Sequence, residues 1–157
     1  MGLWLSRLRD SGGLVMDALP KHSVSVAGVV VDPEGRVLAV RRRDNGRWEV
    51  PGGVLELGES FAEGVRREIA EETGVDVVVG PVSGVYKNMV RGVVALVFRC
   101  ELRSGVPRPT DEAAEVRWLS REEVCALMVP AFAIRVFDAF EGGTSVRVHD
   151  GNDMLSR

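Results

Sequence analysis

The segment GVLELGESFAEGVRREIAEETGV at residues 53–75 places six glutamates between stretches of apolar, valine-rich sequence. Ser60 followed three residues later by Glu63 is a capping box, the signature of a helix start, and Gly74 is suited to end that helix. The segment therefore predicts a helix of about 13 residues. Extended sequence lies before and after it, so the fold must place an acidic helix among strands.

Continuous or alternating apolar residues predict the strands. The first two form a hairpin, because the sequence DPEG at residues 32–35 between them is typical of a turn. The expected strands are 22–31, 36–42, 75–80, 91–102 and 116–120, with a short extended piece at 48–53. Residues 81–88 are expected to be a loop or strand end, and residues 104–115 a polar loop.

The C-terminal part of the chain predicts two further helices. One begins after Ser120, which forms a second capping box with Glu123. The other spans about 131–141, where apolar residues recur at helical spacing. Residues 142–157 are glycine-rich and polar and are expected to form a loose C-terminal tail. With residues 1–20 as an N-terminal extension, one domain remains over residues 21–141, a usual domain size.

Composition excludes several classes of function. The net charge of −3 and the pI near 5.5 give no basis for nucleic-acid binding. The apolar run at residues 3–5 is too short for a signal peptide or a membrane span, so no membrane contact is expected. Cys100 and Cys125 show no metal-ligand or redox spacing, which is typical of thiols in a cytoplasmic protein. An anionic substrate would therefore need a local device such as a metal ion or a few arginines.

The acidic helix has the chemistry of such a device. At 100° per residue, Glu68, Glu71 and Glu72 fall within one arc of about 100° that borders the apolar face. Like charges at these spacings cost a few tenths of a kcal/mol per pair when solvated. Mg²⁺ takes oxygen ligands, so a divalent cation of this kind would neutralise the three carboxylates. The alternative interpretation is an acidic helix face that is simply exposed to solvent. Gly52 and Gly53 favour the cation, because they let the backbone approach it closely.

The same stretch resembles the Nudix box in full. The matching positions, at the spacing of that family, are Gly53, Glu59, Arg67, Glu68, Ile69, Ala70, Glu71, Glu72, Thr73, Gly74 and Val75. The resemblance, which is to MutT-type members and covers roughly residues 22–141, implies an α/β fold, a Nudix-like α/β/α sandwich with a mixed β-sheet. It also implies a hydrolase that uses Mg²⁺ or Mn²⁺ to cleave the P–O–P bond of a nucleoside diphosphate linked to another moiety.

The resemblance further implies the residues of the site. The implied metal ligands are the Gly52 carbonyl, Glu68, Glu71, Glu72 and, from the loop before a late strand, Glu112. For this last position Glu115 and Asp111 are the rivals. The implied catalytic residues are Glu68 and Glu71, with Glu59 and Arg67 orienting the ligands. One of the box glutamates, with Glu68 as the candidate, takes a proton from the attacking water.

Substrate contacts are expected from four residues: Arg41, Arg43, Tyr86 and Asn88. For the two arginines, a solvated strand end is the alternative. The short, single-domain chain favours nucleoside triphosphates, including damaged ones, over nucleotide sugars. A different class of function is a sensor that keeps the Nudix fold and binds nucleotides without turnover, although the intact box favours an enzyme. The resemblance leaves open whether the chain forms a homodimer.

Overall fold

The computed structural model describes residues 19–156, so almost all of the predicted N-terminal extension lies outside the described residues. The helices are α1 (Phe61–Thr73), α2 (Arg121–Leu127) and α3 (Pro130–Glu141). The strands are β1 (Ser23–Val31), β2 (Val37–Arg42), β3 (Trp48–Glu49), β4 (Gly52–Val54), β5 (Asp76–Asn88), β6 (Val93–Ser104), β7 (Ala113–Leu119), β8 (Ser145–His149) and β9 (Met154–Leu155). None of the helices within residues 19–156 is long and apolar enough to cross a membrane.

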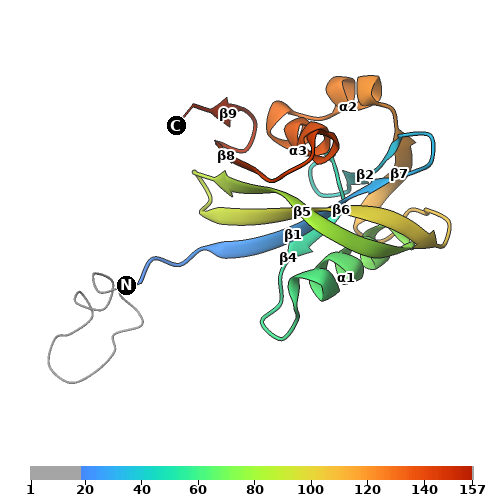
Figure 1. The fold of residues 1–157 in the computed structure, drawn as a ribbon, viewed down its shortest axis with the longest axis horizontal. Helices are drawn as coiled ribbons and strands as arrows, with labels where there is room; N and C mark the ends of the chain where they lie inside the picture. The colour runs from blue at the N-terminus through green and yellow to red at the C-terminus, as the bar shows by residue number, and fades with distance from the viewer. Residues whose placement is uncertain (1–18, 157) are drawn as a thin grey trace, which may run out of the picture.

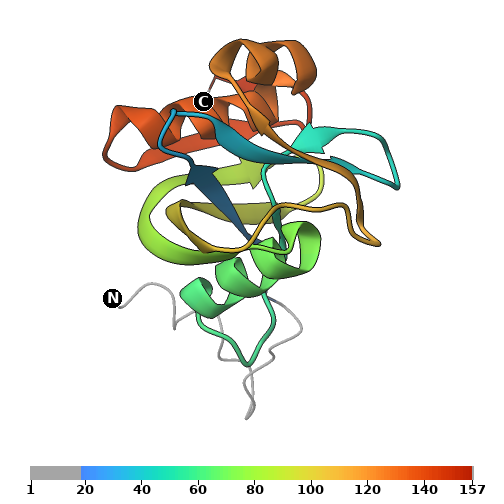
Figure 2. The ribbon, with the colours of Figure 1, turned by 90° about the vertical axis from the view of Figure 1, so that its right-hand side faces the viewer.

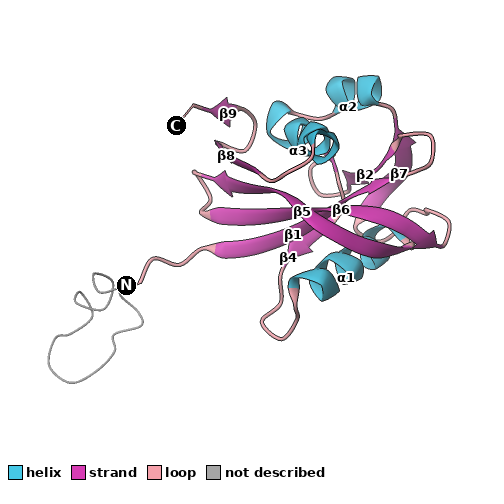
Figure 3. Ribbon diagram, in the orientation of Figure 1, coloured by secondary structure: helices cyan, strands magenta, loops and turns pink. Residues whose placement is uncertain are grey.

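The described strands form one mixed sheet. Its main order is β3-β2-β1-β6-β5-β8-β9, with β4 paired to β1 and β7 paired to β2. The pairs β1–β6 and β5–β8 are parallel, and the remaining pairs are antiparallel. Figures 1 and 3 show α1 on one side of this sheet and α2 and α3 on the other, and Figure 2 shows the same three layers from the side. The expected α/β sandwich with a mixed sheet is confirmed.

Each face of the sheet buries its own apolar cluster. Val26 and Val30 of β1 pack with Val65 and Ile69 of α1. The neighbouring residues of β1, such as Val29, belong to the cluster under α2 and α3. This division follows from the period of two in a strand, which directs successive side chains to opposite faces. Because both faces of β1 are covered, α1 lies on a rigid support.

The acidic helix begins and ends as predicted. The Ser60 side chain accepts a hydrogen bond from the Glu63 backbone, the Glu63 side chain accepts one from the Ser60 backbone, and Gly74 has the left-handed φ of 78°. Gly64 lets the preceding loop lie close to α1, since a Cβ there would come within 2.8 Å of Leu55 and 2.9 Å of Glu59. The start of the helix and the loop before it therefore form one tightly packed unit.

Two predicted irregular segments are strands in the structure. Residues 81–88, expected as a loop or strand end, belong to β5, which extends from Asp76 to Asn88. Gly80 and Pro81 usually interrupt a strand, so the sequence pattern did not predict that the strand continues through them. In the structure they lie where the register with β6 shifts. A bulge absorbs the irregularity and the strand continues.

The prediction of a loose tail from residue 142 onward is wrong for residues 145–149. These residues form β8, which pairs parallel to β5. Arg147 of β8 donates to the buried Asp138 of α3 through Nε at 2.8 Å and Nη2 at 2.7 Å. An ion pair thus holds this short, polar strand against the helix. Hydrophobic patterning gives no sign of such a contact, so the strand was not expected.

Candidate metal-binding site

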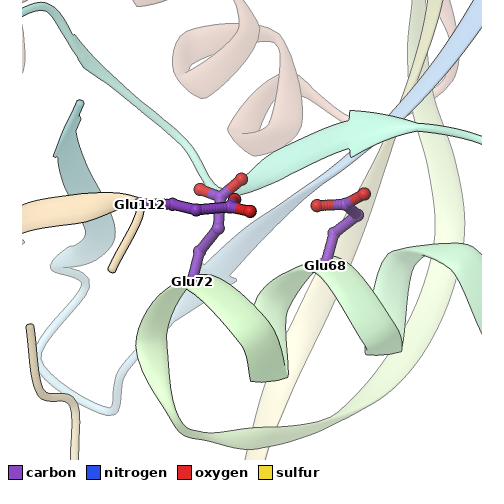
Figure 4. Close-up of side chains that lie close together, drawn as sticks. All are labelled: Glu68, Glu72 and Glu112. Carbon is purple, nitrogen blue, oxygen red and sulfur yellow. The ribbon is translucent and has the colours of Figure 1, made fainter. Parts of the chain in front are cut away.

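Three glutamates meet beside the acidic helix. Glu68 and Glu72, one turn apart on α1, and Glu112, in the loop before β7, each offer a carboxylate oxygen within 4.8 Å of the other two. Figure 4 shows the two helical side chains rising from α1 and Glu112 approaching from a different element. A helix and a distant loop therefore bring three negative charges into one small space.

Burial makes this arrangement electrostatically unfavourable without a cation. Glu68 and Glu72 are only 7% and 3% exposed, and no residue among those described donates a hydrogen bond to the Glu72 carboxylate. Burial raises the pKa of Glu72 to about 8, and the charges of Glu49, Glu68 and Glu112 contribute to this rise. Burial also raises the pKa of Glu68. The charged forms of both carboxylates are therefore disfavoured when no cation is bound.

Arg67 organises the carboxylates around the cluster. Its Nε and Nη2 donate to Glu59 at 2.9 and 2.6 Å, and its Nη1 donates to Glu68 at 2.7 Å and to Glu71 at 3.3 Å. The hydrogen bonds from Arg67 lower the pKa of Glu59 to about 2, so Glu59 stays ionised and fixes the guanidinium. This geometry suits the orienting role predicted for Glu59 and Arg67, which stays a prediction.

The predicted ligands Glu71 and Gly52 lie outside the group of three. The Glu71 side chain is 51% exposed and contacts Arg67. Gly52 pairs with Ala27 of β1, and a Cβ on Gly52 would come within 2.5 Å of the Val26 carbonyl oxygen. The close approach of β4 to β1 is therefore what requires glycine at position 52.

Gly53 leaves room for the Glu68 carboxylate. A Cβ at Gly53 would lie 2.5 Å from Glu68 Oε1 and 2.6 Å from Oε2. The Gly53→Ala substitution is expected to displace this carboxylate, because the end of a side chain moves more easily than the backbone. We expect a loss of about 10- to 100-fold in turnover, the range seen when the support of a metal ligand is disturbed, with little change in the free energy of unfolding.

Gly58→Ala is the matched control for this substitution, since no heavy atom beyond the adjacent residues of the chain lies within 4 Å of a Cβ at Gly58. Steady-state kinetics and urea unfolding of both variants separate a displaced carboxylate from a damaged fold. Equal turnover in the two variants would show that the position of the Glu68 carboxylate is unimportant.

The structure distinguishes the three candidates for the loop carboxylate. Glu112 joins the group, Glu115 forms an ion pair with Arg41 at 2.7 Å, and Asp111 is exposed and outside the group. Arg41, predicted to contact substrate, is thus already paired with a carboxylate.

The other predicted substrate contacts also have partners elsewhere. The Arg43 Nε donates to the Thr110 carbonyl at 3.1 Å. Tyr86 is fully buried in the cluster under α3 and donates its hydroxyl to Asp138 at 2.7 Å. The side-chain oxygen of Asn88 accepts from the backbone of residues 90 and 91 at 3.0 Å, which closes the turn between β5 and β6. The structure therefore gives no support to substrate contacts by Tyr86 or Asn88.

Glu49 is part of the electrostatics of the site and was not predicted. It lies on β3 between the buried residues Trp48 and Val50, and it accepts a hydrogen bond from Arg42 Nη1 at 3.1 Å. Its charge is the largest contribution from a neighbouring group to the raised pKa of Glu72. In the sequence, the role of Glu49 was indicated only by its position between two apolar residues, three positions before Gly52.

Comparison with known proteins identifies the family. A family model described as the NUDIX domain matches residues 21–140. A MutT-like protein from Streptomyces ambofaciens is 56% identical over 137 residues, which cover 87% of this chain and 89% of that protein. A putative 8-oxo-dGTP diphosphatase from Bacillus subtilis (strain 168) is 30% identical over 121 residues, or 76% of this chain and 81% of that protein.

Two further comparisons agree with this result. An ADP-ribose pyrophosphatase from Methanocaldococcus jannaschii is 33% identical over 103 residues, which cover 61% of this chain and 60% of that protein. The crystal structure of a MutT protein from Methanosarcina mazei Go1 aligns with a TM-score of 0.67 at 31% identity, covering 79% of this chain and 96% of that chain. The chain therefore belongs to the Nudix family and is a Nudix hydrolase.

Proposed function

We propose that the protein is a divalent-metal-dependent pyrophosphohydrolase, with Mg²⁺ or Mn²⁺ as cofactor, that cleaves a P–O–P bond of a nucleoside triphosphate. The observation that carries the proposal is the convergence of Glu68, Glu72 and Glu112 from a helix and a separate loop. Two of these carboxylates are buried. A folded protein has little reason to bury like charges together unless a cation joins them.

The donor set fits a hard divalent cation. Mg²⁺ holds oxygen ligands at about 2.0–2.1 Å, so ligands on opposite sides of one ion are about 4 Å apart. The three carboxylate oxygens lie within 4.8 Å of one another, which is close to this size. Glu68, Glu72 and Glu112 would hold the ion, and Glu71 and the Gly52 carbonyl remain further proposed ligands. When bound, Mg²⁺ polarises phosphoryl oxygens and lowers the pKa of a coordinated water.

The residues of α1 supply the remaining chemistry. We assign proton acceptance from water to Glu68, because its carboxylate lies in the acidic group and is held at a fixed position by Arg67. Arg67 holds Glu68 Oε1 at 2.7 Å and is itself held by Glu59. This arrangement limits the rotation of the Glu68 carboxylate, which keeps its proton-accepting oxygen in place.

The relatives support two classes of substrate. One relative is a putative 8-oxo-dGTP diphosphatase and another is an ADP-ribose pyrophosphatase. We favour triphosphates, including damaged ones, since the diphosphatase aligns over a larger share of both chains.

A panel of nucleoside triphosphates, 8-oxo-dGTP, ADP-ribose and nucleotide sugars tests the substrate class. Each is incubated with the protein and Mg²⁺ or Mn²⁺, and the products are separated by chromatography. The proposal predicts hydrolysis of a triphosphate to the monophosphate and pyrophosphate, abolished by EDTA. Preferred cleavage of ADP-ribose would overturn the substrate assignment, and tight binding without turnover would identify a sensor.

A further inference from the structure

The loop that carries Glu112 is attached to the last turn of α1. The final carbonyl groups of a helix have no donor within the helix. Here the Thr110 hydroxyl donates to the Glu72 carbonyl at 3.2 Å, and the Arg108 backbone amide donates to the Thr73 carbonyl at 2.9 Å. The loop therefore donates hydrogen bonds to terminal carbonyl groups of the same helix that carries Glu68 and Glu72.

The Thr110 hydroxyl also fixes the turn in which Glu112 lies. The Ala113 amide donates to Thr110 Oγ1 at 3.2 Å, and the Thr110 amide donates to the Ala113 carbonyl at 3.0 Å. These two hydrogen bonds enclose Asp111 and Glu112. One hydroxyl thus accepts from the turn that holds Glu112 and donates to the backbone of Glu72.

Arg43 supports the same turn from the other side. Its backbone amide donates to the Glu112 carbonyl at 3.1 Å, and its Nε donates to the Thr110 carbonyl at 3.1 Å. These contacts extend the pairing of β2 with β7 beyond Arg42 and Ala113. The turn is therefore held by the helix end and by the strand end together.

These hydrogen bonds oppose the electrostatic repulsion among the three clustered glutamates. Glu112 is exposed on a loop, and its charge faces Glu68 and Glu72. Repulsion between like charges pushes a mobile carboxylate away when no cation is bound, and a displacement of about 0.5 Å is enough to weaken a functional site. The hydrogen bonds of the neutral Thr110 hydroxyl resist this movement without adding charge to the cluster, and the Arg43 guanidinium adds a further hydrogen bond to the same turn.

We propose that Thr110 and Arg43 are positioning residues that hold Glu112 in the acidic group. The inference rests on the proposed role of Glu112 as a metal ligand. It gives Arg43 a role different from the predicted substrate contact. Thr110 acts through Glu112 and does not itself touch the cation or the nucleotide.

Thr110→Val tests the proposal, because valine has the same shape and lacks the hydroxyl. Mn²⁺ binding is measured directly by the loss of the free-ion signal in electron paramagnetic resonance, alongside turnover. We expect Mn²⁺ affinity to fall about 10-fold, the lower end of the range for residues that support a metal ligand. The KM for nucleotide at saturating Mn²⁺ should not change. Thr110→Ser should restore Mn²⁺ affinity to within about 2-fold of the original chain.

Thr144→Val is the matched control, since the Thr144 hydroxyl also donates to a backbone carbonyl, that of Val82 at 3.3 Å. It lies before β8 and touches none of the clustered glutamates, so Mn²⁺ affinity should be unchanged. Urea unfolding confirms that each variant is folded at the assay temperature.

Measurements in the Glu112→Gln background distinguish the proposed positioning role of Thr110 from the proposed metal-binding role of Glu112. If Thr110 acts through Glu112, adding Thr110→Val to Glu112→Gln should lower Mn²⁺ affinity no further. An equal 10-fold loss in both backgrounds, or no loss in either, would overturn the positioning role. If Glu112→Gln itself leaves Mn²⁺ affinity unchanged, the proposed metal role of Glu112 fails, and the positioning role fails with it.

Discussion

Replacing Glu72 by glutamine is expected to lower turnover of the nucleotide substrate by about 10³-fold. The substitution keeps the shape of the side chain and removes one of the buried charges that would hold the cation. A bound metal supplies several kcal/mol of charge stabilisation in the transition state, and each 1.36 kcal/mol is a factor of ten in rate. Initial rates at saturating nucleotide and Mg²⁺ give this value.

Glu122→Gln is the control for the loss of one glutamate charge, because Glu122 is an exposed residue of α2 on the opposite side of the sheet. Its turnover should stay within about 2-fold of the original chain, as expected for surface substitutions away from a site. If Glu72→Gln also kept near-normal turnover, the acidic group would have to be removed from the mechanism.

The same substitution is expected to stabilise the protein above about pH 8 when no metal is present. Burial raises the pKa of Glu72 to about 8 in the folded chain, compared with an ordinary value of 4.5. The stability contributed by this group is therefore complete below pH 4.5 and is lost as the pH rises through about 8. For a group with this shift, the free energy of unfolding falls by about 3 kcal/mol between pH 6 and pH 9.

Urea unfolding in EDTA at the two pH values measures this loss. The original chain should lose stability from pH 6 to pH 9 by about 3 kcal/mol more than Glu72→Gln, which has no proton to release at this position. Saturating Mg²⁺ should reduce the difference, because the cation replaces the proton. Parallel pH profiles for the two chains in EDTA would show that Glu72 ionises normally in the folded protein.

Local sequence patterns were sufficient to predict the helix that carries the site. The Ser60 capping box and Gly74 define α1, and the 3.6-residue period correctly places Glu68 and Glu72 on one face. The period also placed Glu71 on that face, yet the Glu71 side chain contacts Arg67. Periodicity gives the direction of a side chain from the helix axis, but a charged neighbour one turn away on the same helix, here Arg67, decides where its charged end lies.

Features that depend on distant parts of the chain were not accessible to the same reasoning. Tyr86 was expected in a loop near substrate, whereas it is buried by contacts with α3, more than 40 residues later in the sequence. Strand β8 is held by the ion pair of Arg147 with Asp138. Glu112 was chosen from three acids by its distance from a late strand, and only the hydrogen bonds of Thr110 and Arg43 show how the loop brings it to α1.

Binding of Mn²⁺ to the full chain, followed by electron paramagnetic resonance in the presence of a nucleotide analogue that cannot be hydrolysed, tests the central claim most directly. The account predicts a bound ion whose affinity falls about 10- to 100-fold or more in Glu72→Gln and in Glu112→Gln, and remains unchanged in Glu122→Gln. Equal Mn²⁺ affinity in all four proteins, or no bound ion in any of them, would contradict the assignment of this acidic group as the metal site.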